Sequence, residues 1–214
     1  MDLFSAIVRF FQHGGVFMYP IALVLALAVA ITLERWFFLR RTEKENRALW
    51  EQVQPMIASN DLAGAEALVA GSETAIGRIL QNGLAQSRVD RRRSEVEIAT
   101  EEGLMEVLPA IEKRTHYLAT FSNMSTLLGL LGTVVGLIGA FAALGEADPT
   151  EKADLLSQGI SEAMNCTAFG LMVAIPALIL HAYLQSRTTE LVDGLEGVAA
   201  KFVSVVCGRT RSGS

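Results

Sequence analysis

The chain has 214 residues, of which 51% are hydrophobic and 19% charged, with a formal net charge of −5 and a mean hydropathy of +0.36. This composition excludes disordered, collagen-like and disulfide-scaffold proteins, and the lack of a sustained basic face gives no support to nucleic-acid binding. Asp, Glu, Lys and Arg are absent from three windows, residues 16–33, 117–144 and 163–184. Because about 20 helical residues cross the hydrocarbon core of a bilayer, we predict an all-α membrane protein with three transmembrane helices.

The first window predicts a transmembrane helix over residues 16–38, preceded by a short outer, periplasmic segment over residues 1–15. A cleaved signal peptide is the alternative, but Arg9 is the only base before the window and no small-residue cleavage site is evident. Basic residues are frequent after it. Under the positive-inside rule, these charges place the N-terminus outside and residues 39–116 in the cytoplasm.

The cytoplasmic region is expected to be helical. Residues 40–58 mix charges with spaced apolar positions. Asn60-Asp61 is a suitable cap for a helix that ends at Gly71-Ser72. A further helix is expected over residues 75–86.

Ser94 and Glu97 have the spacing of a capping box, which predicts that a helix begins there. Pro109 is expected to kink this helix without ending it, so we predict a continuous rod over about residues 94–144. The basic triple Arg91-Arg92-Arg93 just before it has two interpretations. It is a solvated turn of cytoplasmic charge, which we favour, or a contact for anionic lipid headgroups.

The second window predicts a transmembrane helix over residues 117–144, and a short periplasmic loop over 145–154 with one base and four acids follows it. The third transmembrane helix is expected over residues 155–184. Residues 185–214 then form a cytoplasmic helix and tail, because heptad-like apolar positions continue past the span. These positions are Leu184, Leu191, Leu195 and Val198.

Small and hydroxyl residues recur at helical spacing in the second and third windows. The stripe in the second window includes the GxxxG of Gly132 and Gly136, so another helix can approach it closely. Its members are Ser125, Gly129, Gly132, Gly136 and Gly139, and the matching stripe of the third window is Ala163, Thr167, Gly170 and Ala174. Thr126 and Thr133, seven residues apart, share a second face. Tight packing, with each Thr bonding a carbonyl four residues earlier, is the simplest interpretation.

Glu162 favours a functional interpretation, since residues 155–186 hold no other charge. A carboxylate in an apolar span is costly in lipid and usually faces a bundle interior, a cavity or an ion path. The alternative is an interfacial residue that reaches the outer surface. A proton is the expected ion, because one carboxylate with hydroxyl neighbours offers too few oxygen ligands for a metal cage.

The segment LLGLLGTVVGLIGAF (127–141), followed by GISEAMNCTAFGLMVAIPALILHAYL (159–184), closely resembles the signature of the MotA/TolQ/ExbB proton-channel family. Leu33-Glu34-Arg35 is also similar to that family's sequence. The three-span layout resembles the ExbB and TolQ branch more than flagellar MotA, which has four spans. The chain departs from the family at Ser125-Thr126, where relatives often read Ala-Pro, and at Cys166-Thr167, where they often carry Ala-Thr or Thr-Thr.

The resemblance implies a pore-forming stator subunit of a motor driven by the proton motive force in the bacterial inner membrane, with the C-terminus cytoplasmic. Family members form homopentamers whose second and third helices line a pore around the single-span helices of two ExbD- or TolR-like partners. The partner's membrane Asp carries the proton; Thr133 and Thr167 match the residues that contact it, and Glu162 matches the third-helix acid. We add Thr126 to the lining and assign Gly129, Gly132, Gly136 and Gly170 to helix packing. Force on the envelope then serves TonB-type uptake, Tol-type maintenance or gliding-type motility.

Other chemistry has little support in the sequence. Cys166 and Cys207 lack CxxC spacing, and His13, His116 and His181 form no ligand cluster. No nucleophile elbow, phosphate loop or zinc motif is present, so we expect neither an enzyme nor a metal or cofactor. A non-conducting oligomeric membrane scaffold, in which the small stripes and polar residues only specify assembly, is the alternative function.

Overall fold

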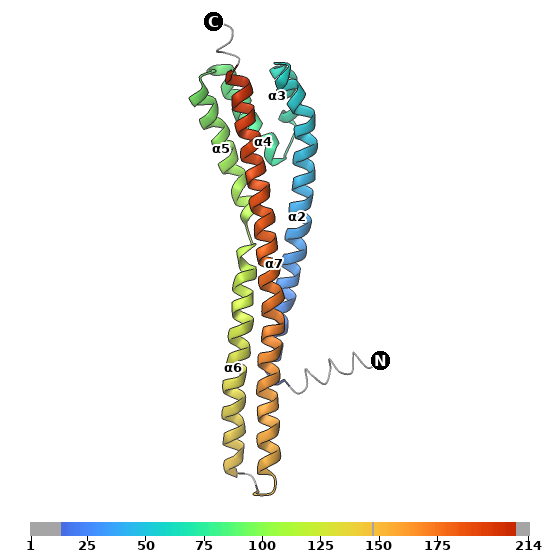
Figure 1. The fold of residues 1–214 in the computed structure, drawn as a ribbon, viewed down its shortest axis with the longest axis vertical. Helices are drawn as coiled ribbons and strands as arrows, with labels where there is room; N and C mark the ends of the chain where they lie inside the picture. Colours follow the sequence, from blue (N-terminus) through green and yellow to red (C-terminus); the bar gives the residue numbers. More distant parts are fainter. Residues whose placement is uncertain (1–13, 147, 209–214) are drawn as a thin grey trace, which may run out of the picture. The chain divides into compact units, whose positions relative to one another are not determined.

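The computed structural model describes residues 14–146 and 148–208, and every regular element in them is a helix (Figure 1). The helices are α2 (Met18–Ala58), α3 (Leu62–Ala70), α4 (Ala75–Val89), α5 (Arg93–Glu112), α6 (His116–Glu146) and α7 (Lys152–Gly208). Three helical stretches are long and apolar enough to cross a membrane: Met18–Ala58, Arg93–Gly145 and Lys152–Gly208. The predicted all-α class with three such helices is therefore confirmed. Most of the predicted outer segment, residues 1–13, lies outside the described residues, as does His13.

The chain divides into two compact units, which are described separately. The first, here called the membrane unit, consists of Met1–Leu33 and Arg114–Tyr183. The second, the charged unit, consists of Glu34–Lys113 and Leu184–Ser214. Helices α2 and α7 each contribute to both units, because neither is interrupted where its apolar span meets charged sequence.

In the membrane unit, α6 and α7 run side by side (Figure 1). They approach closely because glycines face each other: a Cβ added to Gly129 would lie 3.3 Å from the Cα of Gly170. The start of α2 joins α7 through a buried cluster that contains Met18, Ile21 and Phe169. Three segments far apart in the sequence therefore form one packed unit.

In the charged unit, the predicted short helices are present with local caps. The Asp61 side chain accepts from the Gly64 amide at 2.9 Å and begins α3, as the sequence predicts. Thr74 caps α4 in the same way through the Gly77 amide, at 3.1 Å. The predicted helix over residues 75–86 is confirmed, and α4 extends it to Val89. Helix α7 runs unbroken to Gly208, and Leu184 and Leu195 on it are buried; the cytoplasmic place of this part of the chain stays a prediction.

The predicted continuous rod over about residues 94–144 is wrong, because α5 ends at Glu112 and α6 begins at His116. Arg114 between them has a left-handed backbone (φ 68°), which interrupts the ladder of hydrogen bonds between each amide and the carbonyl four residues before it. Side chains of other helices bond the carbonyls at this break. Arg35 of α2 donates to the Ile111 carbonyl in the charged unit, and His181 of α7 donates to the Thr115 carbonyl in the membrane unit, at 3.1 Å.

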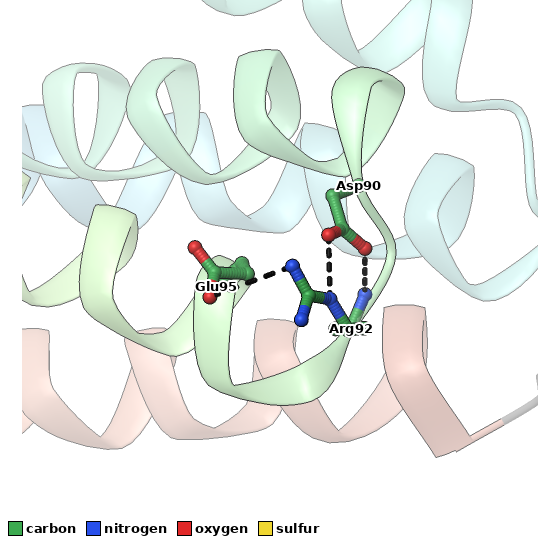
Figure 2. Close-up of polar contacts among 3 residues, drawn as sticks. All are labelled: Asp90, Arg92 and Glu95. Carbon is green, nitrogen blue, oxygen red and sulfur yellow. Dashed lines mark hydrogen bonds and ion pairs between the residues drawn. The ribbon is translucent and has the colours of Figure 1, made fainter.

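The predicted capping box at Ser94 and Glu97 is also wrong. Helix α5 begins at Arg93, with Arg92 as its cap residue and no side-chain capping bond. Asp90 instead closes the preceding turn: its carboxylate accepts from the Arg92 amide at 2.9 Å and from the Arg92 guanidinium at 2.6 Å (Figure 2). These two bonds hold the pKa of Asp90 below its ordinary value.

The basic triple has acidic neighbours in the structure. The Arg92 guanidinium also lies 3.9 Å from the Glu95 carboxylate (Figure 2). The Arg93 guanidinium lies 3.8 Å from the Glu97 carboxylate. These exposed pairs are compatible with a solvated turn of charge, because surface ion pairs contribute little net energy. Lipid contact by this segment stays a prediction.

Candidate functional site

The centre of the candidate site is Glu162, which α7 places in the membrane unit beside a cavity of about 380 Å³. The start of α2 and both long helices α6 and α7 contribute its walls. The described lining residues are Gly14, Gly15, Val16, Phe17, Gly132, Val135, Gly136, Gly139, Ala140, Leu155, Gln158, Gly159, Glu162 and Cys166. Glu162 is half-buried and is the one charged member of this set. The carboxylate therefore lies beside a partly open cavity, where a group that exchanges protons could be reached.

The three candidate threonines make different hydrogen bonds. Thr126 donates to the Ser122 carbonyl of its own helix at 3.1 Å, as the simple packing interpretation expects. Thr133 donates to the Leu130 carbonyl, three residues earlier rather than four, at 2.5 Å. Thr167 instead crosses between helices and donates to the Gly129 carbonyl of α6 at 3.0 Å. Of these three threonines, Thr167 is the one whose hydrogen bond links α6 to α7.

None of these threonines is among the described residues that line the Glu162 cavity. Thr133 and Thr126 lie on α6 away from the glycines that border it, because they belong to the second face of that helix. A single chain therefore does not bring Thr133 and Glu162 into one cavity. A shared pore would need surfaces from more than one chain.

The candidate packing glycines lie where α6 meets α7. A Cβ added to Gly170 would lie 2.6 Å from the Ser125 carbonyl oxygen, and one added to Gly136 would lie 3.2 Å from the Cβ of Ala163. A Cβ added to Gly132 would overlap the Cys166 Sγ. Gly139, by contrast, faces open space. The close approach along this interface is made within one chain.

Two contributors to the site were not singled out from the sequence. Ser122 of α6 donates to the Ala174 carbonyl of α7 at 2.8 Å, a second bond between the helices in addition to that of Thr167. Gln158 lines the cavity one turn before Glu162. Its spacing of four residues from Glu162 could have predicted the shared face. The partner of Ser122 depends on the register of α6 against α7, which the sequence does not contain.

Other reactive groups do not gather into a site within the described residues. No group of three or more His, Cys, Asp or Glu there could hold a metal ion. Cys166 and Cys207 are free thiols in different units, and burial raises the pKa of Cys207 above its ordinary value. His181 donates to the carbonyl of Thr115, in the turn between α5 and α6.

Three apolar helices, with a carboxylate and hydroxyls between them, define a multi-pass membrane protein of the channel type. The chain matches the MotA/TolQ/ExbB proton channel family over residues 71–197. It is 32% identical over 196 residues to an ExbB-like protein of Synechocystis sp., covering 89% of this chain and 75% of that one. It is 29% identical over 212 residues to the biopolymer transport protein ExbB of Salmonella typhimurium, covering 89% and 82%.

A third relative is the Tol-Pal system protein TolQ of Haemophilus influenzae, 32% identical over 99 residues that cover 46% of this chain and 43% of that one. The chain therefore belongs to the MotA/TolQ/ExbB proton channel family, on its ExbB and TolQ branch. It is a multi-pass protein of the inner membrane with a role in energy transduction, in a family of channel-type proteins rather than enzymes.

Proposed function

We propose that this chain is the pore-forming stator subunit of a motor that couples proton flow to force on the cell envelope. The observation that carries the proposal is Glu162, an acid within an apolar span that borders a cavity between three helix segments. Membership of a proton channel family supports it. Each proton that moves down the membrane potential supplies about 2.3 kcal/mol per 100 mV, which is the energy source of the motor.

In this proposal, five copies of the chain surround two copies of a single-span partner of the ExbD or TolR kind. Within one chain, the glycines already join α6 to α7, so contacts between copies must use other faces of these helices. Large apolar side chains are exposed on both helices, among them Leu127, Ile138 and Ile175. These faces are available to lipid, to neighbouring copies and to the partner.

The residue roles follow from this arrangement. Thr133 and Thr126 lie on the face of α6 that does not pack on α7, so they would line the pore and orient the partner's membrane Asp. Thr167 lies at the interface of α6 and α7, where it donates to the Gly129 carbonyl, and Glu162 is the acid that exchanges the proton with the cavity. The N-terminus is periplasmic and the C-terminus cytoplasmic, in agreement with the distribution of basic residues.

A proton-flux assay tests the proposal. The chain would be purified with its native partner, and the complex reconstituted into liposomes that contain a pH-sensitive dye. Glu162→Gln and Thr133→Val should each abolish proton flux while the oligomer keeps its native mass. Glu151→Gln, which changes an exposed acid before α7, is the matched control and should retain flux.

The alternative, a non-conducting membrane scaffold, gives the opposite pattern. For a scaffold, Glu162→Gln and Thr133→Val would leave proton flux and energy-dependent function unchanged, whereas Gly132→Leu would disrupt assembly. Mass spectrometry identifies the co-purified partner, whose outer domain determines which process the motor drives. That domain distinguishes TonB-type uptake, Tol-type envelope maintenance and gliding-type motility.

A further inference from the structure

The turn that precedes α2 lies directly against the Glu162 carboxylate. Gly15 in this turn has a left-handed backbone, with φ +72°. A Cβ added to Gly15 would overlap Glu162 Oε1 and would lie 3.0 Å from its Cδ. The carboxylate therefore occupies the space that a side chain at residue 15 would need. Glycine meets both requirements of this position: it tolerates the left-handed backbone, and its lack of a side chain leaves room for the Glu162 carboxylate.

The turn is held in place by packing on α7. Met18 and Ile21, in the first turns of α2, are fully buried with Cys166 and Phe169 of α7. Phe17 packs against the same cluster. The Met18 amide donates to the Gly15 carbonyl at 3.3 Å, which links the turn to the helix. A side chain at residue 15 could not be accommodated by simply moving the turn away, since this core would have to open.

Within residues 14–146 and 148–208, few other groups that could set the orientation of the carboxylate line its cavity. Among the described residues that line the cavity, Glu162 is the one charged side chain, and Cys166, four residues along the same helix, is the one other titratable group. Gln158 is the one amide side chain in the set. The remaining described walls are glycine and apolar side chains, so the shape of the turn is a main constraint on the carboxylate.

We propose that Gly15 is a positioning residue for Glu162, and that its missing side chain keeps the carboxylate in the orientation from which it exchanges protons. This inference rests on the proposed function, in which Glu162 exchanges the proton with the cavity. The three nearest heavy atoms to a Cβ added at residue 15 all belong to Glu162, and the pore-lining threonines are not among the described residues of this cavity. A misplacement of about 1 Å can lower a rate on the order of a hundredfold.

Proton flux through the reconstituted complex with its native partner is the first test. Gly15→Ala should lower flux by roughly tenfold or more with the oligomer intact. Gly197→Ala is the control, because nothing lies within 4 Å of a Cβ added at this exposed position of α7 and it does not line the cavity. It should lower flux by no more than about twofold.

A shorter acid separates the contact from backbone strain. Strain from a left-handed alanine is the same whatever residue 162 is, whereas Glu162→Asp withdraws the carboxylate from Gly15. Flux of the Glu162→Asp protein is therefore compared with and without Gly15→Ala, and the tenfold loss should shrink to about twofold or less. An equal loss in the two backgrounds would overturn the proposal. Where Gly15→Ala does not assemble, Gly15→Asn replaces it, since Asn tolerates the left-handed backbone.

Infrared spectroscopy gives a readout that does not depend on transport. The carboxyl band of Glu162 is assigned by its loss in Glu162→Gln, and the frequency of the band is compared between variants of the purified full chain. Gly15→Ala should shift the band, because a side chain at residue 15 displaces the carboxylate, and Gly197→Ala should leave it in place. An unmoved band in Gly15→Ala contradicts the positioning role. If Glu162→Gln keeps full flux, the proposed function fails instead, while the infrared comparison still decides whether Gly15 positions the carboxylate.

Discussion

The membrane unit and the charged unit hold their helices together by different means. In the membrane unit, α6 and α7 meet at glycines, and the hydroxyls of Ser122 and Thr167 donate to carbonyls across the interface. In the charged unit, Gly103 also lets α5 approach α4, but large buried side chains such as Ile79 and Leu80 surround the contact. The short helices there carry local caps, and ion pairs such as that of Arg88 with Glu66 lie on the surface.

The difference follows from the solvent that each unit is built for. Lipid tails are as apolar as leucine, so a large apolar side chain gains little by leaving them, and close backbone packing is what joins helices. Accordingly, Ile138 and Ile179 of the membrane unit are each more than 60% exposed. In water, burial of apolar surface is the main driving force. Substitutions in matched pairs therefore test the comparison.

The largest expected effect is at the glycine interface. Gly170→Val should lower the stability of the membrane unit by about 3 kcal/mol or more, because its Cβ meets the backbone of Ser125 and Gly129, which cannot rotate away. Unfolding in mixed micelles measures it. Gly139→Val, at a glycine that faces open space, is the control. Similar losses in the two variants would show that close packing is not what joins α6 to α7.

Arg35 provides the corresponding test in the charged unit. It is fully buried, donates to the Ile111 carbonyl and lies 4.8 Å from the Phe38 ring centroid. Arg35→Ala should destabilise the chain by about 2 kcal/mol, since the hydrogen bond to a charged group is lost and a carbonyl is left unsatisfied. Arg40→Ala, an exposed cation over the Trp36 ring, should cost only about 0.5 kcal/mol in the same unfolding experiment. A loss of stability in Arg35→Ala no larger than that in Arg40→Ala would contradict the stabilising role given to the buried Arg35 side chain.

Thr167 and Thr126 separate a bond between helices from one within a helix. Thr167→Val removes the bond to Gly129 and should lower stability by about 0.6 kcal/mol, the average for such bonds in a membrane. Thr126→Val removes a bond to its own helix and should be near neutral in the same micelle assay. A larger loss of stability in Thr126→Val than in Thr167→Val would show that the bond within the helix contributes more than the bond between helices.

Asp90 should give the smallest effect, and one that depends on pH. The Arg92 amide and guanidinium lower its folded pKa below the ordinary 3.8, so its carboxylate stabilises the folded state above that pH. The contribution is lost as the pH falls from about 3.8 through the lower folded pKa. Asp90→Asn should therefore show a weaker loss of stability with acid than the native chain, in denaturant unfolding between pH 5 and 2. Parallel pH curves would show that Asp90 makes no such contribution.

Local features were the ones that sequence reasoning predicted well. The three spans follow from uncharged windows, and Asp61 caps α3 because the cap needs only a side chain three residues from its amide. Ser94 and Glu97 had equally suitable spacing, but Asp90 bonds the Arg92 amide in the preceding turn, and α5 begins at Arg93 without a side-chain cap. Similarly, Pro109 predicted a kink within one helix, whereas the helix is interrupted at Arg114. In both cases the helix boundary lies at residues outside the motif that predicted it.

The sequence by itself determined three apolar spans, an all-α class and one acid in the third span, because a helix needs about 20 largely uncharged residues to cross the hydrocarbon core. The motifs of its second and third spans carried the resemblance to a proton channel family. Only the tertiary structure decided that Thr167 bonds Gly129 on another helix and that Gly15 lies against Glu162. Such contacts depend on the register and approach of helices far apart in the chain, and helical periodicity specifies a face but not the residue that meets it.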